Sequence, residues 1–68
     1  MSTPQRTTEA RVVAMDKAGL TARRVKREVS ICNADNSVEF HFFSKADASI
    51  LLARVMVNAD DSAILLDG

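Results

Sequence analysis

The longest apolar stretch of the chain is residues 49–57, SILLARVMV, in which Arg54 is the only charged residue. A membrane span needs about 20 apolar residues, and this stretch has about half that number, so it predicts a buried element of a globular domain. Ser44 offers a cap for a helix that starts at Lys45, and apolar residues then run almost all the way around that helix. The pattern therefore favours an apolar second helix over 45–57.

A short internal repeat supports a different interpretation of the same stretch. Residues 33–37, NADNS, are followed 25 positions later by 58–62, NADDS. If the repeat is structural, 52–57 and 63–66 form a second hairpin with Val55 opposite Ile64, and the apolar stretch is a strand. The helix is preferred because the stretch is long and contains leucine, alanine and methionine. Under both interpretations residues 63–66 are expected to be buried, most simply as a short last strand.

The N-terminal part of the chain predicts a helix between Pro4 and Gly19. Proline fits the first turn of a helix, and glycine accepts the left-handed conformation that ends one. A short strand over 10–15 is the alternative, and the polar residues 1–8 are the segment that could be flexible. At helical spacing the apolar residues of the inner face are Ala10, Val13, Ala14 and Ala18.

The clearest local signal is a β-hairpin over residues 29–43. Asparagine and aspartate in 33–36 favour a turn between two alternating segments. We expect the register that gives one apolar face and one polar face, because a shift of one residue would put apolar side chains opposite polar ones. That register pairs Ile31 with Val38 and Val29 with Phe40.

Residues 20–28 fit either a helix capped by Thr21 or a strand, and the sequence leaves both open. As a helix, the segment AMDKAGLTARRVKREV, residues 14–29, is similar to a helix-turn-helix. The resemblance implies a DNA-binding transcriptional regulator, with a helix-turn-helix-like segment at 10–29 and the hairpin 29–43 as its wing. It implies contacts to phosphates and base edges by Arg23, Arg24, Lys26 and Arg27.

The length and charge of the chain limit its classes of function. Its 68 residues predict a single small domain, 1–68, with a formal net charge of zero. Residues 1–29 carry a formal charge of plus four and residues 30–68 minus four, which fits either an anionic partner or two halves that attract each other. A single cysteine, together with the absence of a secretory signal pattern, predicts a cytoplasmic location.

No pattern of catalytic, metal-binding or cofactor-binding residues is recognisable. The single histidine, His41, and the single cysteine, Cys32, cannot supply a zinc site within one chain, and two glycines cannot form a phosphate-binding loop. We therefore expect no catalytic residues, no metal and no cofactor. Phe43 falls on the more polar face of the predicted hairpin with His41, where it could anchor a partner.

These observations predict a small α+β domain with an N-terminal helix, a central antiparallel β-hairpin, an apolar second helix and a short C-terminal strand. We expect a non-enzymatic protein that acts by protein–protein contact, as a regulator, inhibitor or adaptor, with a second copy of itself as one candidate partner. DNA binding is the alternative, and no membrane contact is expected. The candidate binding residues for a protein or nucleic acid are Arg23, Arg24, Lys26, Arg27, His41 and Phe43.

Overall fold

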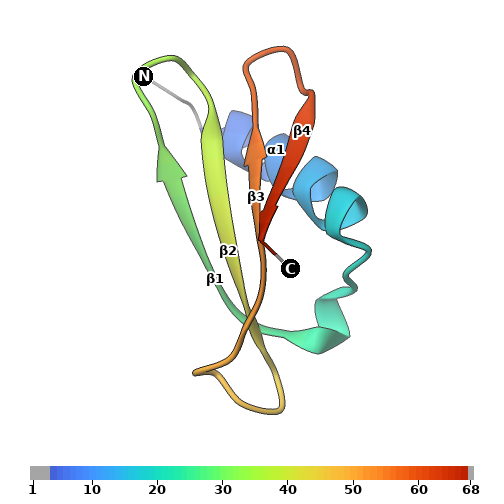
Figure 1. Ribbon diagram of the computed structural model, residues 1–68. Coiled ribbons are helices and arrows are strands. Elements are labelled where there is room, and N and C mark those ends of the chain that lie inside the picture. The colour runs from blue at the N-terminus through green and yellow to red at the C-terminus, as the bar shows by residue number, and fades with distance from the viewer. Residues whose placement is uncertain (1–3, 68) are drawn as a thin grey trace.

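One helix and a four-stranded antiparallel sheet make up the domain (Figure 1). The computed structural model describes the backbone of residues 4–67 and the side chains of residues 8–67. The strands lie in the order β1-β2-β3-β4, each antiparallel to its neighbours, and α1 packs on one face against β2, β3 and β4. The elements are α1 (Pro4–Ala18), a 3-10 turn η1 (Ala22–Arg24), β1 (Val25–Cys32), β2 (Val38–Ser44), β3 (Leu51–Val57) and β4 (Ala63–Asp67).

Helix α1 has the bounds that the sequence predicts. It begins at Pro4, and Gly19 follows its last residue with a φ of 67°. The Gly19 N–H donates to the Asp16 carbonyl (3.1 Å) and the Leu20 N–H to the Met15 carbonyl (3.0 Å), which is the Schellman arrangement. Residues 4–8, which the sequence left as a candidate flexible segment, are therefore helical, and residues 1–3 lie outside the described part of the chain.

Replacement of Gly19 by alanine should destabilise the domain by about 1 kcal/mol. The left-handed backbone conformation costs about that much free energy for an L-residue with a side chain. The added Cβ meets no atom within 4 Å, so the backbone conformation alone causes the loss. Urea unfolding of Gly19→Ala and of the control Lys17→Ala measures it. Equal unfolding free energies for the two variants would show that the helix end does not depend on Gly19.

The hydrophobic core lies between α1 and one face of the sheet. Its largest fully buried side chains come from the two central strands, β2 and β3. The predicted inner face of α1 is confirmed, because Ala10 and Ala14 are fully buried and Val13 and Ala18 pack against the core. The buried residues of this core are Ala10, Ala14, Met15, Val38, Phe40, Phe42, Ala53, Val55 and Val57.

The predicted second helix over 45–57 is wrong, because these residues form a loop and then strand β3. Ser44 Oγ accepts hydrogen bonds from the N–H groups of Ala46 (3.1 Å) and Asp47 (3.4 Å), as a helix cap would. The chain then turns back, since the Ser44 N–H donates to the Ile50 carbonyl (2.9 Å). The all-round apolar pattern arises because alternate residues of β3 enter the core while the others lie on the opposite face of the sheet.

The hairpin of β1 and β2 is confirmed, but its predicted register is wrong by one residue. Cys32 pairs with Val38 and Ser30 with Phe40, so Val29 and Ile31 lie on the face away from α1. The turn chemistry determines this register. The Asn33 N–H donates to the Ser37 carbonyl (2.9 Å), which closes a three-residue loop rather than the four-residue loop expected.

The repeated sequence forms two turns of the same construction at one end of the sheet (Figure 1). Asn36 and Asp61, the fourth residues of NADNS and NADDS, have φ values of 68° and 67°. In each turn the first asparagine binds the serine through its backbone and side chain. The repeat is therefore structural, and it gives β3 and β4 the same one-residue shift from the expected register, with Val55 opposite Leu65.

Acid should weaken these two turns. Hydrogen bonds from the Ser37 hydroxyl and N–H lower the pKa of Asp35, and those from Ser62 lower the pKa of Asp60. A folded-state pKa below the unfolded value gives stabilisation that is present above the unfolded pKa, 3.8, and lost as the pH falls through the folded value. The unfolding free energy should therefore fall on acidification, and it should fall less in a Ser37→Ala/Ser62→Ala variant.

Urea unfolding of wild type and variant from about pH 6 to about pH 2.5 tests this dependence. Ser30→Ala is the control, because Ser30 is an exposed serine of β1 outside both turns. Parallel pH profiles for wild type and the turn variant would contradict the role assigned to the serine hydroxyls.

The ambiguous segment 20–28 is neither a full helix nor wholly a strand. Residues 22–24 form η1, and the chain enters β1 at Val25. Thr21 makes no side-chain cap on η1. The second helix of the helix-turn-helix-like segment at 10–29 is therefore absent. The last strand is confirmed, since β4 contains the predicted residues 63–66. The expected burial of these residues is wrong, because β4 is an edge strand and Ile64, Leu65 and Leu66 are 46%, 42% and 39% exposed.

Candidate binding surfaces

The face of the sheet opposite α1 is the first candidate surface, and we call it the open face. Within the described part of the chain no helix covers it. The pairing of the strands places residues from all four strands on it in two consecutive rows. The rows across β1 to β4 are Ile31, Glu39, Met56 and Ile64, and next to them Val29, His41, Arg54 and Asp67.

Apolar side chains flank the open face on both outer strands. Val29 and Ile31 of β1 are 39% and 44% exposed, and Ile64 of β4 is 46% exposed. Leu66, the extra residue at the bulge of β4, is 39% exposed. Each outer strand therefore carries an apolar margin of exposed aliphatic side chains, and exposed apolar surface of this kind is typical of a contact site.

A polar cluster occupies the centre of the open face. Glu39 Oε2 lies 2.5 Å from His41 Nε2 on the same strand and 3.9 Å from Arg54 Nη1 on β3. The Nε of Arg54 is buried and has no hydrogen-bond partner among the described residues. The centre of this face therefore presents both signs of charge between two apolar margins.

Arg27 and Phe43 extend the open face toward the end of the sheet where η1 lies. They are opposite each other in β1 and β2, and the Arg27 guanidinium carbon is 4.5 Å from the centre of the Phe43 ring. This is a cation–π geometry, and it holds the ring under a positive charge. The aromatic face is therefore already covered by a side chain of the same protein.

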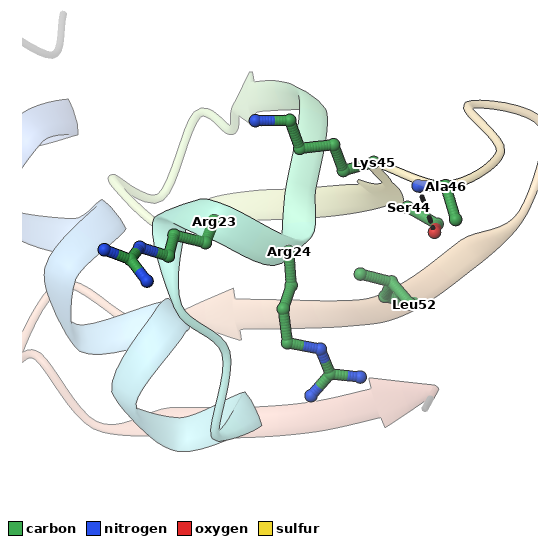
Figure 2. Close-up of a pocket in the computed structure, with 6 residues that line it drawn as sticks. All are labelled: Arg23, Arg24, Ser44, Lys45, Ala46 and Leu52. Carbon is green, nitrogen blue, oxygen red and sulfur yellow. Dashed lines mark hydrogen bonds between the residues drawn. The ribbon is translucent and has the colours of Figure 1, made fainter.

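A basic pocket is the second candidate surface (Figure 2). It has a volume of about 470 Å³ and lies where η1 meets the loop between β2 and β3. The Lys45 N–H donates to the Arg24 carbonyl (2.9 Å), which joins the two segments. The lining residues are Arg23, Arg24, Ser44, Lys45, Ala46 and Leu52.

Five of the six residues that the sequence singled out lie on these two surfaces, and Lys26 lies on neither. Arg27, His41 and Phe43 lie on the open face, whereas Arg23 and Arg24 line the basic pocket. Lys26 is the extra residue at a bulge of β1, with an exposed side chain. His41 and Cys32 lie on opposite faces of the sheet, since Cys32 is paired with the core residue Val38.

Sequence reasoning missed most residues of these surfaces, among them Glu39 and Arg54 of the polar cluster and Lys45 and Leu52 of the pocket. It placed Val29 and Ile31, which lie on the open face, in the core. Lys45 could have been found from the hairpin, because strands that pair around Asn33–Ser37 bring residue 45 back beside residue 24. Leu52 and Arg54 could not be placed while 45–57 was read as a helix.

The described part of the chain contains neither a metal-binding group of residues nor a helix that could cross a membrane. Among the described side chains, no group of three or more His, Cys, Asp or Glu residues is arranged to hold a metal ion. Within residues 4–67 no helix has the length and apolar character needed to cross a membrane.

Comparison with known proteins adds no relative. No protein-family model matches the chain, and neither the curated proteins nor the solved structures contain a significant match. The two surfaces are therefore interpreted from their own chemistry.

Proposed function

We propose that the protein is a small non-enzymatic binding protein that contacts another protein chain through the open face of its sheet. The observation that carries the proposal is the pair of apolar margins, Val29 with Ile31 and Ile64 with Leu66, on the face opposite the core. A sheet that packs on one side only normally has polar side chains on its other side. Here exposed apolar residues lie on both outer strands instead.

The chemistry of the open face indicates the kind of partner. Protein interfaces combine an apolar contact area with a few polar groups that fix orientation. Glu39 and Arg54 provide charges of opposite sign, so a partner with a mixed acidic and basic surface is favoured over a uniformly charged one. A second copy of the chain meets this requirement and is one candidate partner.

The DNA-binding alternative has less support from the geometry. A helix-turn-helix places its second helix in the major groove, and in this protein the residues expected to form that helix, within 20–28, are η1 and the first part of strand β1. The four predicted contact residues also divide between a pocket, a bulge and the open face. We therefore do not propose a helix-turn-helix mode of binding.

A comparison of three baits tests the proposed function. Wild type, an Ile31→Lys/Ile64→Lys variant and a Val12→Lys variant are immobilised and exposed to the same cell extract, and bound proteins are quantified. Val12 is the matched control, because it is an apolar residue of α1 that is 63% exposed. Sedimentation velocity on the same proteins measures self-association.

We expect a partner, or a second copy, that wild type and Val12→Lys bind equally and that the open-face variant loses. A charge placed on each of the two apolar margins should weaken binding by about tenfold or more. Circular dichroism must show that all three baits are folded. Association that the open-face changes leave intact would overturn the proposal.

A further inference from the structure

We propose that the basic pocket binds a small ligand that carries two or more negative charges on phosphate groups, of the nucleoside diphosphate class. This inference is independent of the proposed protein contact, because the pocket and the open face are lined by different residues. Its volume of about 470 Å³ lies within the roughly 300–1,000 Å³ range typical of small-molecule sites.

The charge of the pocket is the first argument for an anion. Three of its six lining residues are basic, namely Arg23, Arg24 and Lys45, and none is acidic. Among residues 8–67 no ion pair is made by any of these three side chains. A bound anion would therefore meet three cations that have no ionic partner of their own.

The directions of the three side chains indicate more than one negative group. In Figure 2 the three side chains point in different directions, and the charged groups at their ends lie apart from one another. The three cationic groups do not converge on one point, so a ligand that contacts all of them needs acceptors at separate points. Two linked phosphates offer acceptors at separate points, and arginine binds phosphate oxygens through two parallel N–H donors.

The remaining walls suit the rest of such a ligand. Leu52 and Ala46 provide apolar surface beside the cations, which fits a sugar or a base next to a phosphate group. Ser44 Oγ already accepts hydrogen bonds from two N–H groups, so its own hydrogen is left to donate to an acceptor. The backbone is fixed beforehand by the bond between the Lys45 N–H and the Arg24 carbonyl.

The distribution of charge over the whole molecule also favours binding of an anion at the pocket. Asp35, Asp60 and Asp61 lie in the two turns between β1 and β2 and between β3 and β4, and those turns contain no lysine or arginine. The two segments that line the basic pocket, η1 and the loop between β2 and β3, lie at the opposite end of the strands (Figure 1). At the pocket end Arg23, Arg24 and Lys45 outnumber the one acidic residue of the loop between β2 and β3, Asp47, so the charge distribution of a protein of zero net charge favours an anion at the pocket.

Calorimetric titration with adenosine diphosphate and with pyrophosphate, at about 50 mM salt, tests the proposal. The variants are Arg24→Gln/Lys45→Gln and, as a matched control, Arg27→Gln, which removes a cation that lies over Phe43 outside the pocket. We expect saturable binding by wild type, weakened about tenfold or more in the pocket variant and less than about twofold in the control. Binding of adenosine diphosphate should exceed that of pyrophosphate.

Four outcomes would overturn the inference. The first is no saturable binding of either probe at millimolar concentration, and the second is an equal loss of binding in the control variant, which would show attraction to charge in general. The third is equal binding of both probes, because it would show that Leu52 and Ala46 do not contact the ligand. The fourth is tighter binding of a single-stranded DNA that also depends on Arg24 and Lys45, because a nucleic acid would then be the ligand. The Ile31→Lys/Ile64→Lys variant should bind both probes as wild type does. A failure of the ligand proposal can therefore be distinguished from a failure of the proposed protein contact.

Discussion

Replacement of Phe40 by alanine is expected to destabilise the protein by about 3–5 kcal/mol, enough to unfold a large fraction of so small a domain. Phe40 is fully buried on β2 and stacks on Phe42, with ring centres 5.9 Å apart. A chain of this length has few other core residues to close the cavity that the change leaves. Urea unfolding monitored by circular dichroism measures the loss.

Phe43→Ala is the matched control for this prediction. It removes the same side chain from the same strand, but Phe43 lies on the open face, where it contacts Arg27. Loss of an exposed cation–π contact should cost about 0.5–1 kcal/mol. Similar losses for the two variants would mean that β2 does not bury one face only.

The second large effect is expected on β3, where a charge can be placed on either face. Val55→Asp puts a carboxylate into the core next to Phe40, and Met56→Asp puts one on the open face beside Glu39. An unpaired charge in an apolar core costs several kcal/mol, so Val55→Asp should not fold under ordinary conditions. Met56→Asp should fold, with a smaller loss caused by its acidic neighbour.

The same pair of variants discriminates a strand from a helix at 51–57. On a helix, residues 55 and 56 are neighbours on one apolar surface, and both changes should then be severe. Far-ultraviolet circular dichroism and urea unfolding of the two variants provide the measurement. An unfolded Met56→Asp variant would contradict the strand.

The sequence was most informative where one local rule acts alone. Pro4 and Gly19 mark the ends of α1 because each imposes a backbone conformation on its own position. The hairpin of β1 and β2 was recognisable for the same reason, from the asparagine and aspartate residues of its turn. The internal repeat correctly indicated a hairpin of β3 and β4. The length and composition of the apolar stretch favoured a helix instead.

The two errors arise from competition between local and tertiary effects. Residues 45–57 have the leucine, alanine and capping serine of a helix, but a strand next to β2 buries Val55 and Val57 against the core. Sorting apolar and polar residues onto opposite faces could not give the register of β1. That reasoning assumes that Val29 and Ile31 belong to the core. The turn geometry places both on the open face.

The candidate surfaces were predictable only in part. Arginines 23 and 24 were identifiable as basic residues near the hairpin, and Phe43 was correctly assigned to the face opposite Phe40. The pocket could not be foreseen, because it depends on the loop between β2 and β3, which was read as the start of a helix.

The proposed contact surface depends most on the register of β1 against β2, because that register makes Val29 and Ile31 available to a partner. Proton NMR of the folded protein tests it directly through contacts between the α-protons of paired residues. The register described here predicts cross-peaks for Ser30 with Phe40 and for Cys32 with Val38. Cross-peaks that pair Val29 with Phe40 and Ile31 with Val38 instead would place both apolar residues in the core, and the proposed contact surface would lose its margin on β1.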